Sequence, residues 1–213
     1  MKGVLEMKRQ NIVIVGGGST YTVGLIMSLI AEKDTFPLKS IKLYDINKER
    51  QDPVGETVEI LLKENYPEVE EFIYTTDKEV AYEDVDFAFV QIRTGGLEMR
   101  EKDEKIPLNL GCVGQETCGA GGMSYGLRSI PDMIEIINDV RSYSPDAWIL
   151  NYTNPAAIVA EALKRVFPDD NKILNICDMP AAIMVSYAKL LGVEIWDLVP
   201  EYFGLNHFGW FSK

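Results

Sequence analysis

The strongest constraint on the fold is a glycine-rich turn that separates a short apolar run from a helical pattern. Residues 12–15 are all apolar, which is typical of a strand buried on both faces of a parallel sheet. Three glycines follow at 16–18, and apolar residues then recur at helical spacing over residues 25–30. Strand, turn and helix in this order predict the opening of a dinucleotide-binding βαβ unit. Glycines let the backbone approach a pyrophosphate, and the helix start offers free N–H groups.

The turn matches only part of the dinucleotide fingerprint. In the pattern G-x-G-x-x-G, Gly16 and Gly18 fill the first two places and Tyr21 stands in the third. This larger side chain predicts looser packing of the helix on the strand, or a variant of the turn. Asp45 follows a second apolar run, residues 41–44, in the position of a ribose-binding carboxylate. The alternative is a plain glycine turn, with Asp45 as a helix cap.

Length and composition narrow the class of protein. The chain has 213 residues, 46% of them hydrophobic, which suits one large domain or one and a half ordinary ones. No apolar run approaches the roughly 20 residues of a membrane span, and no apolar signal core precedes the turn, so we expect a cytoplasmic protein without a membrane partner. The net charge of −12 argues against nucleic acid as a partner. Three cysteines in such a chain predict buried thiols or ligands, not a disulfide framework.

Strand and helix patterns alternate along the rest of the chain. Asp52 and Pro53 predict the cap and first position of a helix that ends near residue 65. Further helices are predicted at residues 97–109 and 123–143, and others that end near residues 166 and 191. Strands are predicted at residues 41–44, 72–75, 85–92, 148–150, 172–176 and 202–205. This alternation predicts an α/β fold with a Rossmann-type, doubly wound, mostly parallel sheet.

Chemically useful residues follow several of the predicted strands. Because ligands of doubly wound sheets bind beyond the carboxyl ends of the strands, this common position predicts a site there. The residues are Gly16, Asp45, Arg93, Asn151, Asn154, Cys177, Asp178 and His207. A segment with five glycines, residues 111–122, holds Glu116 near its centre and predicts an ordered binding loop.

Each candidate also has a structural interpretation. Cys177 and His207, the only histidine, could bind a metal, or be a buried thiol and a core imidazole. Asp178 could be an acid or a helix cap before a proline. Arginines 93, 100 and 128 could form a clamp for a phosphate or carboxylate, since guanidinium offers a planar fork to oxyanions. They could equally be ion-pair partners, and Arg100 is placed to pair with Glu104 at i,i+4.

Six sequence blocks, in order from about residue 11 to the end, resemble the family 4 glycoside hydrolases. They are Gly-Gly-Gly-Ser-Thr at 16–20, Met-Arg-Glu-Lys-Asp-Glu-Lys-Ile-Pro at 99–107, Gly-Gln-Glu-Thr-Cys-Gly-Ala-Gly-Gly at 114–122, Asn-Tyr-Thr-Asn-Pro at 151–155, Asn-Ile-Cys-Asp-Met-Pro at 175–180 and Gly-Leu-Asn-His-Phe-Gly-Trp at 204–210. Within the family, Cys-Asp-Met-Pro is similar to the 6-phospho-α-glucosidases, or maltose-6'-phosphate hydrolases. The 6-phospho-β-glucosidases usually show Cys-Asn before an apolar residue and proline.

The resemblance implies hydrolysis of 6-phospho-α-glucosides, such as maltose 6-phosphate, by redox-assisted elimination. NAD⁺ takes hydride from C3 of the phosphorylated glucose, which makes the C2 proton acidic. A base removes that proton, the glycosidic oxygen leaves, water adds and the hydride returns. A divalent metal, usually manganese, polarises the C2 and C3 oxygens.

The resemblance also implies roles for residues at matching positions. Cys177 and His207 would bind the metal, and Asp178 would protonate the leaving group. Glu116 would tune the base, and Arg100 and Asn154 would contact the substrate. The implied cofactor-binding residues are Gly16, Gly17, Gly18, Ser19, Thr20, Asp45, Arg50, Ile92, Arg93 and Asn151.

Family members continue into a second half, which this sequence does not contain. The predicted domains are therefore an NAD-binding Rossmann-like domain at residues 8–200 and the start of a truncated C-terminal domain at 201–213. The missing half would carry the tyrosine base and much of the interface of a homo-oligomer, and Tyr125 and Tyr152 are only nearby candidates for the base. The alternatives are an inactive NAD-binding fragment or a 6-phospho-β-glucosidase. A dehydrogenase of the lactate/malate type shares the glycine turn but needs no metal-binding cysteine.

Overall fold

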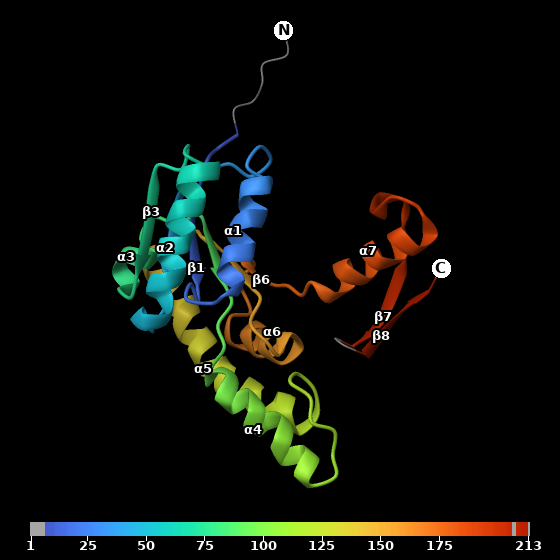
Figure 1. The fold of residues 1–213 in the computed structure, drawn as a ribbon. Helices are drawn as coiled ribbons and strands as arrows, with labels where there is room; N and C mark the ends of the chain where they lie inside the picture. The colour runs from blue at the N-terminus through green and yellow to red at the C-terminus, as the bar shows by residue number, and fades with distance from the viewer. Residues whose placement is uncertain (1–6, 206–207, 213) are drawn as a thin grey trace. The chain divides into compact units, whose positions relative to one another are not determined.

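The chain forms two compact units, Met1–Leu174 and Asn175–Lys213. The computed structural model describes residues 7–205 and 208–212, and Figure 1 draws the secondary structure of both units. The division into domains at residue 200 stays a prediction. Among the described residues, no helix combines the length and apolar character that a membrane crossing requires.

The larger unit is built on a sheet of six strands. The strands are β1 Gln10–Val15, β2 Leu38–Tyr44, β3 Glu71–Thr75, β4 Phe87–Val90, β5 Trp148–Asn151 and β6 Ile173–Asn175. Their order is β3-β2-β1-β4-β5-β6, and β1 pairs in parallel with both β2 and β4. The chain therefore changes direction across the sheet between β1 and β4, which is the topological switch point of a doubly wound fold. The predicted α/β, Rossmann-type sheet is confirmed.

Helices cover both faces of this sheet. They are α1 Tyr21–Ala31, α2 Lys48–Asn65, α3 Lys78–Tyr82, α4 Gly96–Asn109, α5 Gly119–Tyr143 and α6 Ala156–Val166. Alternate residues of β1 point to opposite faces. Ile12 and Ile14 pack with α1 and α2, whereas Val13 and Val15 pack with α3, α5 and α6. Both faces are buried, which is why β1 is apolar at every position of this run.

Helix α2 corrects one prediction. It begins at Lys48, not at Pro53, because Asn47 is the N-cap and its side chain accepts a hydrogen bond from Arg50 N at 3.1 Å. Pro53 lies inside the helix, and the predicted cap Asp52 instead forms an ion pair with Lys48 at 2.7 Å. Asparagine offers the same capping acceptor as aspartate, one turn earlier in the chain.

The other predicted elements are present, with shifted bounds. Strand β4 is shorter than predicted, and α5 begins at Gly119, before the predicted start at residue 123. The short helix α3 and the strand β8 Phe208–Ser212 were not predicted. Figure 1 shows α1 beside α2 and α4 beside α5, in agreement with the packing of these pairs.

The smaller unit combines a helix with a hairpin. Helix α7 Met179–Leu191 is followed by a 3-10 turn, Ile195–Asp197, and by the antiparallel strands β7 Glu201–Leu205 and β8. Tyr202 lies opposite Phe211, and Phe211 also meets the ring of Tyr187 edge-on at 5.8 Å. Aromatic contacts thus hold α7 against the hairpin.

Candidate active site

The glycine turn lies at the switch point, wedged between neighbouring strands. The amides of Gly16 and Gly17 both donate to Tyr44 O, at 2.9 and 2.8 Å. Gly16 has φ +86°, and a Cβ there would lie 2.8 Å from the carbonyl oxygen of Gln91, just beyond β4. A Cβ on Gly17 would lie 2.8 Å from Cβ of Leu43. Glycine is therefore required both by the backbone conformation and by the approach of β2 and β4.

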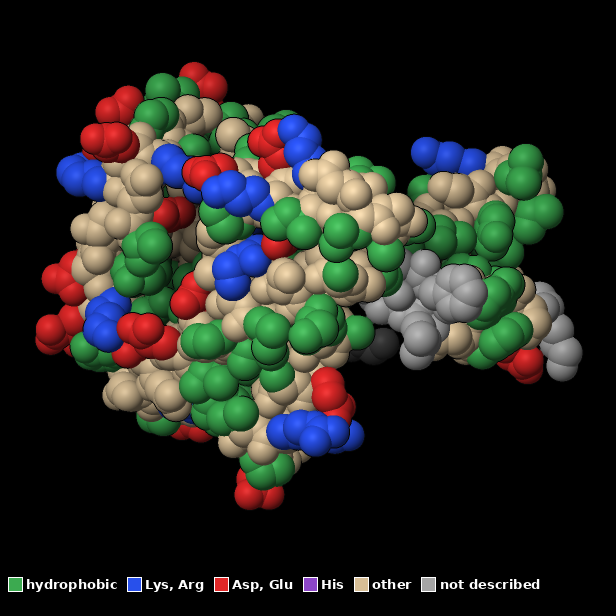
Figure 2. All heavy atoms as spheres, turned by 90° about the horizontal axis from the view of Figure 1, so that it is seen from below, with side chains coloured by type: hydrophobic (Ala, Val, Ile, Leu, Met, Phe, Trp, Pro, Cys, Tyr) green, Lys and Arg blue, Asp and Glu red, His purple; other side chains and the backbone are tan. Residues whose placement is uncertain are grey.

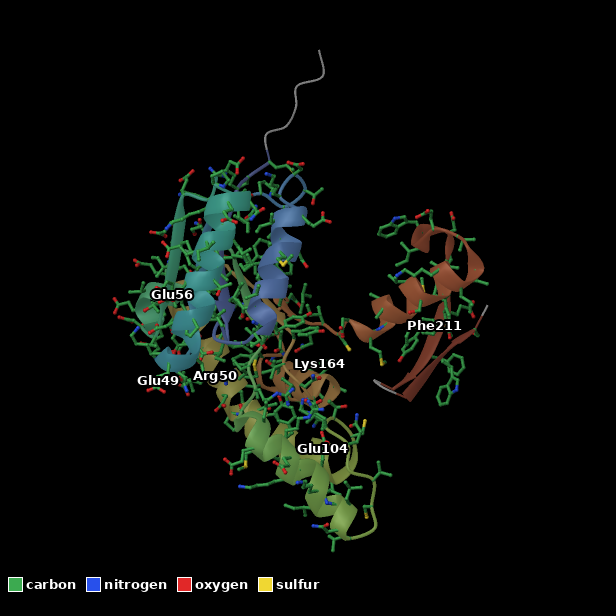
Figure 3. All side chains as sticks on the ribbon, viewed as in Figure 1. Glu49, Arg50, Glu56, Glu104, Lys164 and Phe211 are labelled. Atoms are coloured by element: carbon green, nitrogen blue, oxygen red, sulfur yellow. The ribbon has the colours of Figure 1, made fainter. Side chains whose placement is uncertain are left out.

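Asp45 is joined to the second half of the turn. Its Oδ2 accepts from Gly18 N and its Oδ1 from Asn47 N, both at 2.9 Å. Asn47, not Asp45, caps α2, so the interpretation of Asp45 as a helix cap is wrong. Each carboxylate oxygen keeps a lone pair for another donor. Arg50, in the first turn of α2 (Figure 3), lies next to this site, since a Cβ on Gly18 would be 3.1 Å from Arg50 C.

Tyr21 does not separate the helix from the strand. Its side chain is exposed and stacks on Tyr152, with ring centroids 5.9 Å apart. Thr22 packs inward instead, and its Oγ1 accepts from Nε2 of Gln91 at 2.7 Å. The structure thus supports a variant of the turn over looser packing. Ser19 lies within the turn, where its side chain accepts from Tyr21 N at 3.2 Å.

Gln91 is a site residue that the sequence analysis missed. Its Nε2 also lies 3.4 Å from Gly16 O, so the side chain ties the turn to the start of α1. Its Oε1 is buried and has no hydrogen-bond partner among the residues that the structure describes. An unpaired buried acceptor beside a glycine cradle fits a ligand that brings donors, as a dinucleotide does. In the sequence, the position of this glutamine within the apolar run 85–92 was the feature that could have identified it as a site residue.

Two predicted clamp residues meet on one carboxylate. Nη1 of Arg93 lies 2.6 Å from Oε1 of Glu116, and Nη2 of Arg100 lies 3.3 Å from Oε2. The contact between Arg93 and Glu116 is an ion pair without the alignment of a hydrogen bond. Its two atoms, Nη1 and Oε1, are both buried, and neither has a hydrogen-bond partner among the described residues. The Glu116 side chain is 18% exposed, so these charges interact under reduced screening.

Arg100 also pairs with Glu104, labelled on α4 in Figure 3, as its i,i+4 spacing predicted. The distance from Nε to Oε1 is 2.9 Å. This hydrogen bond, aided by the charge of Glu116, raises the pKa of Arg100 above its usual value. Arg128 pairs elsewhere: its Nη1 donates to Oδ1 of buried Asp103 at 3.0 Å, and its Nη2 to Oδ2.

Residues 111–118 of the glycine-rich segment form a loop that docks on α4, and residues 119–122 form the first turn of α5. A Cβ on Gly114 would collide with the carbonyl oxygen of Glu104, and one on Gly121 would lie 2.7 Å from that of Asp103. At these positions the close approach is to protein backbone, which fixes the loop that carries Glu116. Cys112 and Cys118, in the same segment, are exposed, so the expectation of buried thiols is wrong for both.

The two predicted asparagines lie at the end of β5 and in the loop that follows it. Asn151 is buried, and its Oδ1 accepts from Thr153 N at 2.9 Å. The carbonyl oxygen of Asn154, before a cis bond to Pro155, accepts from Ser129 Oγ of α5 at 3.2 Å. Ile92 and Thr20 flank the switch point, at the end of β4 and at the cap of α1.

The predicted metal ligand and acid belong to the smaller unit. Cys177 is half-buried, between β6 and α7. Asp178 occupies the N-cap position of α7, but its side chain makes no capping hydrogen bond, which leaves the carboxyl group available for other chemistry. His207 lies outside the described residues. Within residues 7–205 and 208–212, no group of three or more His, Cys, Asp or Glu side chains could hold a metal.

The fold and the switch-point site define a class: an α/β protein with a dinucleotide-type glycine turn. The pattern of the family 4 glycosyl hydrolases matches residues 11–193. The chain belongs to this family, and the resemblance of the six sequence blocks is confirmed.

Three relatives illustrate the similarity. The phospho-α-glucosidase PagL of Clostridium acetobutylicum is 62% identical, over 97% of this chain and 46% of the relative. A crystal structure of a 6-phospho-α-glucosidase from gut microorganisms, in complex with NAD and Mn²⁺, has a TM-score of 0.93 at 61% identity and covers 96% of this chain and 46% of its own. A second such structure, with NAD and glucose 6-phosphate, has a TM-score of 0.90 at 47% identity over the same shares. The chain thus spans about half the length of these relatives.

Proposed function

We propose that this chain is the cofactor-binding part of an NAD- and divalent-metal-dependent 6-phospho-α-glucosidase. The observation that carries the proposal is the switch point between β1 and β4, where the glycine turn, Asp45 and the end of β4 meet. The relatives support the substrate class, since all three carry a phospho-α-glucosidase name. These names favour a 6-phospho-α-glucosidase over a 6-phospho-β-glucosidase.

NAD fits the residues present. The cradle of Gly16, Gly17 and Gly18, which admits no Cβ, and the unpaired Oε1 of Gln91 suit a pyrophosphate and its neighbouring donors. Asp45 would accept hydrogen bonds from the ribose hydroxyls. The other residues that we propose to contact the cofactor are Ser19, Thr20, Arg50, Ile92, Arg93 and Asn151. When bound, NAD⁺ would supply reversible hydride removal at C3 of the sugar.

The remaining roles concern the sugar. Arg100 is 42% exposed and offers donors that its two carboxylate partners do not exhaust, which suits a phosphate or hydroxyl group. Asn154 would contact the substrate from the β5 loop. Glu116 would keep the local charge near neutral and tune the base. Tyr125 is a poor base itself, because burial raises the pKa of its phenol.

The metal would be held by Cys177 and His207, with Mn²⁺ as the ion named in one relative's structure. Thiolate and imidazole are softer donors than Mn²⁺ prefers, so another divalent ion could compete. We also propose a cytoplasmic location, where NAD and phosphorylated sugars are available. A homo-oligomer for the longer protein is proposed from the family resemblance alone.

The role of Asp178 as the acid gives the sharpest test of function. In the enzyme completed with the second half, and with Mn²⁺ and NAD⁺ supplied, Asp178→Asn should reduce turnover of maltose 6-phosphate about 10²–10⁴-fold. Turnover of p-nitrophenyl 6-phospho-α-glucoside should fall far less, because nitrophenolate leaves without a proton. The matched control is Asp197→Asn, in the 3-10 turn of the same unit. Equal losses on the two substrates would show that Asp178 is not the acid.

A further inference from the structure

Tyr125 lies between two arginines. It is part of α5 and only 3% exposed. The guanidinium carbon of Arg93 lies 5.4 Å from the ring centroid and that of Arg128 lies 5.8 Å from it. Both distances fall within the roughly 6 Å range of cation–π attraction. One buried ring therefore contacts two cations that come from different parts of the chain.

Two like charges on one ring are stable only if each is neutralised. Glu116 pairs with Arg93, and Asp103, 8% exposed, pairs with Arg128. The four charges sum to zero, so the ring is not a point of net repulsion. The Arg128–Asp103 pair spans α5 and α4, which anchors one side of the arrangement to the helical scaffold.

Arg93 has less support than Arg128. Its ion pair with Glu116 lacks hydrogen-bond alignment, whereas Arg128 donates two hydrogen bonds to its carboxylate. A long arginine side chain loses considerable rotamer entropy when it is fixed in one direction. The face of Tyr125 supplies the second constraint, because a planar guanidinium beside a ring has few orientations left.

We propose that Tyr125 is a positioning residue, whose ring holds the guanidinium of Arg93 beyond the end of β4, ready for the cofactor. The inference rests on the proposed function, in which Arg93 belongs to the cofactor side. Tyr125 takes no part in proton transfer in this scheme. Its phenyl face alone is needed, so phenylalanine should replace it and leucine should not.

A double-mutant cycle on NAD⁺ affinity tests the inference in the full 213-residue chain. Tyr125→Leu should weaken NAD⁺ binding about five- to tenfold, and Tyr125→Phe should stay within about twofold of wild type. In an Arg93→Met background, Tyr125→Leu should add no more than about a twofold loss, because the ring then has nothing to position. Tyr143→Leu, the same change at the far end of α5, is the control for helix packing. An equal loss from Tyr125→Leu in both backgrounds would overturn the inference.

A second cycle, without ligand, separates this inference from the proposed function. The thermal stabilities of the same four proteins should be non-additive, because Tyr125 and Arg93 interact before NAD⁺ arrives. If wild type binds no NAD⁺, the proposed function fails, and an additive ligand-free cycle overturns the inference independently. If Tyr125→Leu does not fold, the Hε resonance of Arg93 is measured in wild type. Ring current should move it upfield, and a random-coil value would contradict the contact.

Discussion

The carboxylate of Asp45 accepts hydrogen bonds from the backbone and is also proposed to accept them from the cofactor. Its two oxygens already accept N–H groups from Gly18 and Asn47, which fixes the side chain at the end of β2. A fixed carboxylate can accept from a ribose 2'-hydroxyl, and its charge repels a 2'-phosphate. An NAD⁺ preference over NADP⁺ would therefore rest on this one side chain.

We expect the wild-type chain to bind NAD⁺ more tightly than NADP⁺, and Asp45→Asn to narrow the difference. The amide keeps the volume but loses the charge and one acceptor, so NAD⁺ affinity should fall about tenfold while NADP⁺ affinity changes little. Titration calorimetry with both cofactors measures this. The control is Asp52→Asn, which makes the same change in net charge on the exposed side of α2. It should leave the affinities for NAD⁺ and NADP⁺ unaltered. Tighter binding of NADP⁺ by wild type would contradict the assignment.

Residue contacts differ in how far the sequence can predict them. The Arg100–Glu104 pair follows from helical spacing alone. The pairs Arg93–Glu116 and Arg128–Asp103 do not, because they depend on how the glycine-rich loop and α5 pack against α4. For Asp178 the sequence left an acid and a helix cap as alternatives, and the absence of a capping hydrogen bond among the described residues depends on the local geometry at the start of α7.

At the scale of elements, the glycine turn has the most demanding geometry. Gly16→Ala places a methyl group 2.8 Å from the carbonyl oxygen of Gln91, just beyond β4, at φ +86°, so the turn or the chain after β4 must move. We expect a loss of about 1–3 kcal/mol in unfolding free energy and loss of NAD⁺ binding. Gly24→Ala is the matched control: it lies on α1 with nothing within 4 Å, and should stabilise by about 0.5–1 kcal/mol. Chemical denaturation and NAD⁺ titration check both. Unchanged NAD⁺ affinity in Gly16→Ala would remove the turn from the site.

A second element-scale prediction concerns acid stability, where α5 is tied to the loop before β6. Nε of Arg141 donates to Oδ2 of Asp170 at 2.6 Å, and this bond lowers the pKa of that carboxyl, which is 19% exposed. Because the folded pKa lies below the unfolded one, the pair stabilises fully above pH ~4 and its contribution is lost as pH falls through the folded pKa. Asp170→Asn should cost about 1–3 kcal/mol at pH 7 and flatten the acid limb of the stability curve.

Asp146→Asn is the control for this experiment, since its carboxyl pairs with Lys172 but is 98% exposed. Solvent screens that pair, and stability at pH 7 should hardly change. Urea unfolding from pH 3 to 7 measures both variants. An acid limb in Asp170→Asn as steep as that of wild type would show that other carboxylates set the pH dependence.

Long elements with a clear hydrophobic period could be predicted from the sequence. Short elements, and a helix start with two competing capping signals, could not. Buried strands such as β1 stand out as apolar runs, and α5 buries Met133, Ile137 and Val140 at helical spacing. Helix α3 has five residues, too few to show a period, and α2 offered two capping signals one turn apart. The hairpin strand β8 is short and glycine-containing, and its partner β7 supplies the constraint that its own sequence lacks.

At the scale of the molecule, charges of both signs are mixed on the face drawn in Figure 2. Across the face drawn in Figure 2, basic and acidic side chains lie next to one another, although the whole chain carries a net charge of −12. Local neutralisation of this kind recurs where Arg93 and Arg100 meet Glu116 and Glu104. Binding of the proposed anionic sugar phosphate would then depend on a few oriented arginines, because the global field of the chain opposes it.

The larger unit contains every residue proposed for the cofactor, so the 213-residue chain should bind NAD⁺ without any further segment. Ligand that binds only the folded state stabilises it by about 2.7 kcal/mol at 100 times Kd. For a unit of this size that corresponds to a rise in Tm of roughly 5–10 °C.

Differential scanning calorimetry with and without NAD⁺ measures the rise, and Gly16→Ala, which should show none, is the control. Hydrolysis of maltose 6-phosphate by the same chain should be lower than that of the completed enzyme by at least about 10²-fold, because a positioned base contributes that much. Tyr125, whose ring contacts the guanidinium groups of Arg93 and Arg128, is buried, and burial raises the pKa of its phenol. A Tm that does not respond to NAD⁺ would place essential cofactor contacts outside these residues. Turnover equal to that of the completed enzyme would show that a base within them suffices.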